Sequence, residues 1–244
     1  MYNIYKKNEV WFAVIWIIIY CIVTIPIRGE LGDESIVMLV ALAVIAVGIT
    51  AFIKNHNLEE KYGLAGWPEN PGRYLFFIPV WILATGNLWG GVQLAYAGFS
   101  QVCAVLSMLL IGYIEEVVFR GFLFEGMLPK DGTRKAVIIS AVTFGIGHIV
   151  NLLAGQANLE TVMQVFFAIA WGFIFTAVFY KSKSLIPCAL AHGIVNSLSK
   201  FGRENITMEW VYIISTIVAA IAYCTYLFKL SDEKNYETTG GNNN

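Results

Sequence analysis

Eight long apolar blocks, separated by short polar segments, constrain the fold of this chain more than any other feature. A helix that crosses a bilayer needs about 20 mostly apolar residues. Of the 244 residues, 57% are hydrophobic and only 14% are charged, whereas soluble domains are roughly 45–50% apolar and about 25% charged. The sequence therefore predicts an all-α, polytopic membrane protein of about eight transmembrane helices. The blocks cover approximately residues 10–27, 36–53, 74–92, 101–128, 135–153, 159–180, 185–200 and 208–228.

The basic residues are distributed unevenly between the two ends of these predicted spans. Twelve of the sixteen lysines and arginines fall in segments on the side of the two termini, and three fall on the other side. Because cytoplasmic loops carry an excess of Lys and Arg, we expect a multi-pass protein of the cell membrane with both termini in the cytoplasm. We expect one transmembrane domain, 1–230, and a polar, disordered cytoplasmic tail, 231–244. The net charge of −1 gives no indication of a nucleic-acid partner.

Three ionisable residues interrupt the fourth apolar block: Glu115, Glu116 and Arg120. Each such group inside a spanning helix costs about 2.5–3.5 kcal/mol on insertion scales, so it needs a partner. Glu116 and Arg120 are one helical turn apart, which predicts an intrahelical ion pair. Glu115 is rotated by about 100° from Glu116 and cannot readily share that arginine. It must find another partner, stay protonated or face a watered cavity, and a carboxylate without a fixed counter-ion suits a general base.

Two of the three histidines, His148 and His192, also lie inside apolar blocks. Phe144 is one turn from His148 and is expected to form the wall of a pocket, and Asn196 is one turn from His192. An imidazole and a carboxamide on one face can donate hydrogen bonds to an oxyanion. Counted from the cytoplasmic ends of the blocks, Glu115 and His148 lie roughly 20 Å deep and His192 roughly 10 Å. Each residue alone has a structural explanation, either a hydrogen bond between helices or an ion pair that holds two spans together. Their convergence from three blocks, however, indicates a functional site.

These residues resemble the motifs of a known family. Glu-Glu-x-x-x-Arg, Phe-x-x-x-His and His-x-x-x-Asn, in this order on successive blocks, are similar to the three motifs of the CAAX protease and bacteriocin-processing family. That family comprises the Abi proteins and the type II CAAX prenyl endopeptidases, and the resemblance covers about Leu109 to Ser199. It implies an eight-helix intramembrane endopeptidase. The roles it implies are water activation by Glu115 and His148, oxyanion stabilisation by His192 and Asn196, and a supporting part for Glu116, Arg120 and Phe144.

The implied partners are the lipid bilayer and a peptide or protein substrate, prenylated or not, which would reach the site from the cytoplasmic or lipid side. The implied roles are peptide maturation, prenyl-protein processing or bacteriocin self-immunity. We expect no cofactor, because the chain has no His-Glu-x-x-His pair on one helix. A zinc ion held by Glu115, His148 and His192 remains the alternative, although it would leave no obvious separate base.

Two other functions also fit these charges. An ion-coupled transporter would use them as a proton relay and would keep its activity without the His192–Asn196 pair. A non-catalytic membrane adaptor or immunity protein that binds a peptide partner would keep its phenotype when Glu115 is replaced by glutamine.

Overall fold

The computed structural model describes residues 1–231, apart from the side chains of Ala154 and Glu160, and it is all-α. Except for Ser231, the predicted tail lies outside the described residues. Within the described part the chain forms no β-strand. The helical elements are α1 (Tyr2–Lys7), α2 (Glu9–Leu31), α3 (Ile36–Asn55), η1 (Pro71–Phe77), α4 (Ile78–Ala84), η2 (Gly86–Leu88), α5 (Gly98–Glu116), the π-helix η3 (Val117–Phe124), α6 (Glu125–Gly147), η4 (His148–Ala154), α7 (Asn158–Ser182), α8 (Ile186–Leu198) and α9 (Ile206–Lys229).

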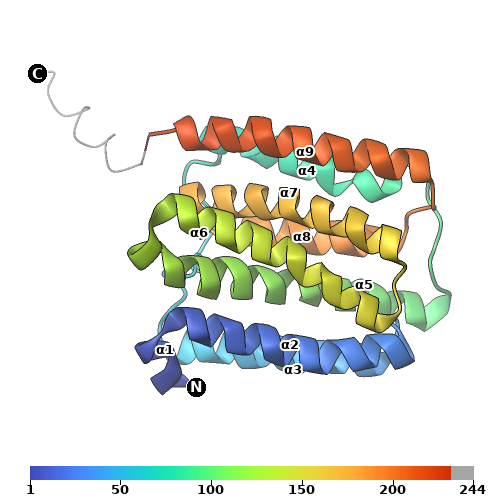
Figure 1. The fold of residues 1–244 in the computed structure, drawn as a ribbon, viewed down its shortest axis with the longest axis horizontal. Helices are drawn as coiled ribbons and strands as arrows, with labels where there is room; N and C mark the ends of the chain where they lie inside the picture. Colours follow the sequence, from blue (N-terminus) through green and yellow to red (C-terminus); the bar gives the residue numbers. More distant parts are fainter. Residues whose placement is uncertain (232–244) are drawn as a thin grey trace, which may run out of the picture.

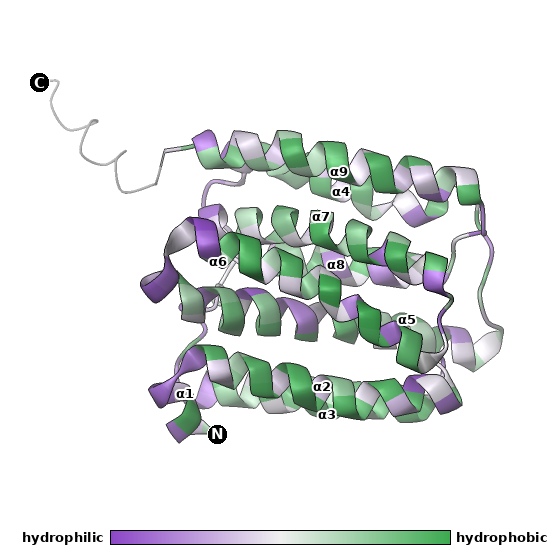
Figure 2. Cartoon of the chain, viewed as in Figure 1, coloured by the Kyte–Doolittle hydropathy of each residue, from purple (hydrophilic) through white to green (hydrophobic). Residues whose placement is uncertain are grey.

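The long helices lie roughly along one common axis (Figure 1). α2 and α3 form one edge of the bundle, α9 and α4 form the opposite edge, and α5 to α8 lie between them. The N-terminus and the C-terminal end of α9 are at the same end of the molecule, as an even number of passes requires. Figure 2 shows hydrophobic residues along the bodies of the helices, while hydrophilic residues gather toward the helix ends and on parts of α5 and α8.

Five helical stretches are long and apolar enough to cross a membrane, and α8 is a shorter apolar helix. The longest stretch has 56 residues and contains two of the predicted blocks, because the chain reverses near Gly132, whose φ is 74°. These stretches confirm the prediction of an all-α polytopic membrane protein. They are Glu9–Leu31, Ile36–Asn55, Gly98–Leu153, Thr161–Ser182 and Ile206–Lys229.

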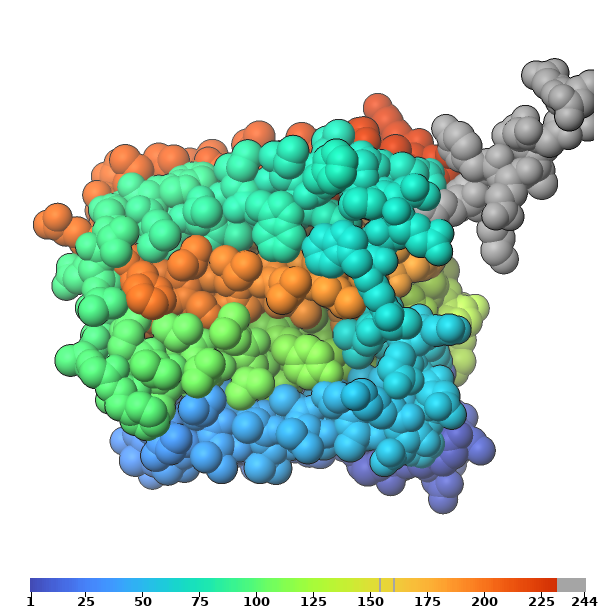
Figure 3. Space-filling view, turned by 180° about the vertical axis from the view of Figure 1, so that it is seen from behind, coloured from blue at the N-terminus to red at the C-terminus, as the bar shows by residue number. Residues whose placement is uncertain are grey.

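The predicted span over 74–92 differs from the others because it is not one long helix. Its α-helical part, α4, has seven residues and lies between the short elements η1 and η2. The backbone at 75–77 has φ values of 49° to 58°, which a right-handed helix does not accommodate. At η2, a Cβ on Gly86 would lie 2.1 Å from the ring of Tyr212, so glycine is required for the contact with α9. Figure 3 shows this segment along one edge of the molecule, beside α8.

A backbone contact between α5 and α8 positions the polar residues of both helices. A Cβ on Gly112 would lie 2.4 Å from the backbone nitrogen of Gly193. Any larger residue at this position would push the two helices apart. The contact places the carboxylates of Glu115 and Glu116 beside the imidazole of His192.

Candidate active site

A buried ionic cluster lies at the centre of the bundle. Glu116 Oε1 accepts hydrogen bonds from Arg120 Nη1 and from His192 Nδ1, each at 2.8 Å. The side chains of Glu116 and Arg120 are fully buried. The predicted intrahelical ion pair is therefore present, but the sequence did not predict that His192 shares the same carboxylate oxygen. Since Glu116 is engaged by two partners, its carboxylate holds the cluster together.

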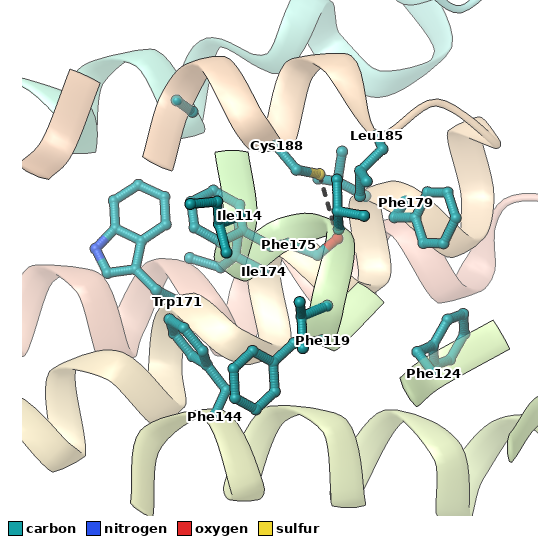
Figure 4. Packing of buried hydrophobic residues seen from close by; sticks show 14 of the residues in the cluster. Ile114, Phe119, Phe124, Phe144, Trp171, Ile174, Phe175, Phe179, Leu185 and Cys188 are labelled. Atoms are coloured by element: carbon teal, nitrogen blue, oxygen red, sulfur yellow. Dashed lines mark hydrogen bonds between the residues drawn. The ribbon is translucent and has the colours of Figure 1, made fainter. Parts of the chain in front are cut away.

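Aromatic rings enclose this cluster and hold the imidazole of His192 in place. The ring of Phe144 meets it edge-on at 5.5 Å between centroids, and the ring of Phe175 stacks on it at 5.4 Å. The guanidinium of Arg120 lies over the ring of Phe144 at 4.3 Å, a cation–π contact. Figure 4 shows Phe144 packed against Phe119, with Phe175 in the same core. The predicted role of Phe144 as a wall residue fits this position.

Glu115 lies at the edge of the ionic cluster, between Tyr20 and His192. One oxygen, Oε1, accepts a hydrogen bond from the hydroxyl of Tyr20 on α2 at 2.9 Å, and the other, Oε2, lies 3.5 Å from His192 Nε2. The side chain is 12% exposed and lines a cavity. The sequence left open whether Glu115 has a partner, stays protonated or faces a cavity. In the structure it has a partner, Tyr20, and it also faces a cavity. Sequence reasoning missed Tyr20, because nothing local relates a tyrosine to a carboxylate 95 residues away.

The cavity has a volume of about 430 Å³ and brings the predicted residues together. Glu115, Phe144, His148 and Asn196 all line it. His192 lines a smaller adjoining recess that shares Phe144, His148 and Asn196 with the main cavity. Residues from three separate predicted spans therefore surround one space, with Glu116 and Arg120 buried behind it.

The hydrogen bond of His148 indicates which of its ring nitrogens carries the proton in the neutral ring. Nδ1 lies 3.1 Å from the carbonyl oxygen of Phe144, one turn earlier. A carbonyl oxygen only accepts, so Nδ1 carries the proton and a neutral ring keeps its lone pair on Nε2. His148 is half-buried at the start of η4, where the α-helix tightens.

A zinc ion held by Glu115, His148 and His192 is the alternative to a site without a cofactor. Within residues 1–231, no three His, Cys, Asp or Glu side chains are grouped so that they hold a metal ion. The absence of a cofactor stays a prediction.

Comparison with known proteins matches part of the chain to a protein family. The model of a family described as type II CAAX prenyl endopeptidase Rce1-like matches residues 97–198, the segment that runs from the start of α5 to the end of α8. No curated protein matches the chain. At the level of the family, the match supports a CAAX-type intramembrane protease. The matched segment, residues 97–198, includes every site residue predicted from the motifs. It is similar to the Rce1-like family of type II CAAX prenyl endopeptidases, and the predicted resemblance is confirmed.

Proposed function

We propose that the chain is an intramembrane endopeptidase in which Glu115 activates a water to attack a peptide bond. The observation that carries this proposal is the separation of the two adjacent glutamates. Glu116 is bound by Arg120 and His192, whereas Glu115 faces the cavity. A carboxylate within reach of a cavity water can accept its proton as the water attacks, and general-base catalysis of this kind contributes about 10²–10⁴-fold.

His148 would orient the same water. With its proton on Nδ1, the ring has Nε2 left as an acceptor. A water that gives one hydrogen to Glu115 and the other to His148 has a lone pair left to attack the carbonyl carbon of the substrate. Both residues then act on the nucleophile, as the resemblance implies.

His192 and Asn196 would stabilise the oxyanion. Because Glu116 accepts from Nδ1 of His192, an imidazolium at this position still has its Nε2–H to donate, and the side-chain amide of Asn196 adds a second donor.

The tetrahedral intermediate collapses when Glu115 passes its proton to the nitrogen of the leaving amine and the C–N bond breaks. One water is consumed, and a new carboxyl terminus and a new amino terminus are formed.

Glu116, Arg120 and Phe144 would position His192 without touching the substrate. The substrate we propose is a peptide segment, prenylated or not, that reaches the cavity. The chain would then serve in peptide maturation, prenyl-protein processing or bacteriocin self-immunity.

The test is an assay of the purified chain in lipid vesicles with a peptide library, in which mass spectrometry identifies new termini. We expect product from the wild type, and much less from a variant that lacks the proposed base. Equal amounts of product from both would reject the proposal.

Tyr20→Phe should lower kcat about 10-fold while KM stays unchanged. The tyrosine hydroxyl fixes Glu115 through the hydrogen bond at 2.9 Å, and a hydrogen bond to a charged group contributes about 1.5–3 kcal/mol. Each 1.36 kcal/mol is a factor of about ten in rate. Both constants are measured with a peptide that the wild type cleaves.

Tyr113→Phe is the matched control for this variant. It removes a hydroxyl that bonds to Thr50 at 2.7 Å, two residues before Glu115 on the same helix, but outside the cavity lining. We expect wild-type kcat. If both variants lose kcat equally, or if Tyr20→Phe changes only KM, Tyr20 does not position Glu115.

A strong zinc chelator should leave cleavage by the wild type unchanged, because in the proposed mechanism Glu115 and His148 act on the water without a metal ion. The initial rate is compared before and after prolonged treatment of the protein with the chelator. Loss of activity that returns on addition of zinc would instead support the set Glu115, His148 and His192 as ligands.

A further inference from the structure

We propose that the cavity opens to the extracytoplasmic side of the membrane, so that the peptide it takes is presented outside the cytoplasm. That a peptide enters the cavity rests on the proposed function. The side on which the cavity opens follows from the fold and the charge distribution alone. It replaces the expected access from the cytoplasmic or lipid side.

The residues at the mouth of the cavity come from one end of the bundle. Asp33 follows α2, Gln156 precedes α7, Lys200 follows α8 and Glu209 lies in the first turn of α9. Figure 1 shows that these junctions lie at the end away from the N-terminus and from the C-terminal end of α9. Within the described part of the chain, the cavity lining includes no residue of α1, of the segment 56–70 or of the turn 128–134.

The end that holds the termini carries most of the positive charge. Eleven of the fifteen lysines and arginines within 1–231 lie there, in α1, in or beside the loops between spans and at the end of α9. Contacts tie these segments together: Lys61 binds Glu9, and the guanidinium of Arg73 donates to the carbonyl oxygen of Ser231. The mouth end has only Arg28, Lys200 and Arg203 among the described residues. By the positive-inside rule, the end with the termini is cytoplasmic, so the mouth faces the other side.

The mouth is polar and suits water and a peptide better than a lipid tail. Asp33 accepts from Arg28 Nε at 2.8 Å and from Lys200 Nζ at 3.1 Å, while Arg28 Nη1 donates to Asn151 Oδ1 at 3.1 Å. Burial raises the pKa of the Asp33 carboxyl, but the charges of Arg28 and Lys200 lower it by more, so its pKa lies below the ordinary value and the group is ionised. Three charged side chains between 16% and 25% exposed therefore line the rim.

The interior of the cavity is apolar and aromatic below this rim, with Ile17, Phe119, Phe144 and Phe167 in its wall. A peptide that enters from outside would thus place polar backbone or acidic groups against Arg28 and Lys200, and an apolar side chain near Glu115. We infer an extracytoplasmic peptide segment as the substrate class.

Thiol labelling of intact cells tests the side of the opening without any assay of activity. Ser199, exposed at the mouth, is replaced by cysteine, and Lys130, exposed at the opposite end, is replaced in a second variant. Both are made in a chain with Cys21→Ala and Cys224→Ala, which keeps the two buried cysteines. We expect a membrane-impermeant maleimide to label Ser199→Cys in intact cells, and Lys130→Cys only after permeabilisation.

Glu209→Cys is a second probe of the mouth, because Glu209 is exposed and lines the cavity. Size-exclusion profiles in detergent establish which variants fold. If folded mouth variants are not labelled in intact cells, or if Lys130→Cys is, the proposed opening is wrong. Because labelling needs no turnover, a failure here leaves the peptidase assay unaffected, and an inactive protein leaves the labelling result unaffected.

Discussion

Glu115→Gln should lower kcat for peptide cleavage by about 10²–10⁴-fold, the contribution typical of a general base. Glutamine has nearly the shape of glutamate, and its side-chain oxygen can still accept the hydrogen bond from Tyr20, which in the wild type measures 2.9 Å. The variant should therefore fold normally and lose only the ability to take a proton from water. The initial rate in lipid vesicles measures the effect, and the melting temperature in detergent checks the fold.

Glu125→Gln is the matched control. Glu125 follows η3 and is also half-buried, but its carboxylate lies outside the cavity lining, so its activity should equal that of the wild type. Cleavage by Glu115→Gln at the wild-type rate would contradict the role of Glu115. A biological phenotype that persists in this variant would favour the peptide-binding adaptor, and one that survives loss of His192 and Asn196 would favour the transporter.

The local part of the site was predictable from the sequence. Glu116 and Arg120 are separated by one helical turn, and a buried arginine in a membrane helix has few alternatives to a carboxylate on the same face. The three motifs also identified which residues meet at one cavity. By contrast, the bonds from Tyr20 to Glu115 and from His192 to Glu116 join residues 95 and 76 positions apart. Such contacts depend on how the helices pack, which periodicity does not specify.

The depth of His192 shows the same limit. Counted from the end of its block, His192 lay about 10 Å shallower than Glu115, yet Nε2 is 3.5 Å from the Glu115 carboxylate. The reason is that α8 begins inside the protein. Ser184 and Leu185 are buried, and the backbone N–H of Leu185 donates to the carbonyl oxygen of Gly63. The segment around Gly63 therefore covers the start of α8, so the end of an apolar block is not the surface of the protein.

The number of regular spans was predicted less well than the fold class. Apolar composition over 74–92 satisfies a hydropathy count, but α4 has only seven residues. The interruption follows from a turn with positive φ at 75–77 and from the close packing of Gly86 on Tyr212. Neither feature changes the apolar content of the segment, so hydropathy alone does not detect it.

Arg120→Met should destabilise the protein by about 3–5 kcal/mol, the usual cost of removing one partner of a buried ion pair. The substitution leaves the fully buried carboxylate of Glu116 with the hydrogen bond from His192 Nδ1 at 2.8 Å, and it also removes the cation–π contact with Phe144. For a chain of this size we expect the apparent melting temperature to fall by roughly 10 °C or more. Thermal unfolding in detergent measures the shift.

Lys135→Met is the control that separates burial from the mere loss of an ion pair. Lys135 and Asp131 have the same spacing of four residues, but the lysine side chain is 61% exposed, so its loss should change the melting temperature little. The double variant Glu116→Gln, Arg120→Met should regain much of the stability, because no uncompensated buried charge remains. It should stay poorly active, since a neutral amide at position 116 accepts the hydrogen bond from His192 Nδ1 more weakly than the carboxylate does. An unchanged melting temperature in Arg120→Met, or full activity in the double variant, would show that the pair neither stabilises the bundle nor positions His192.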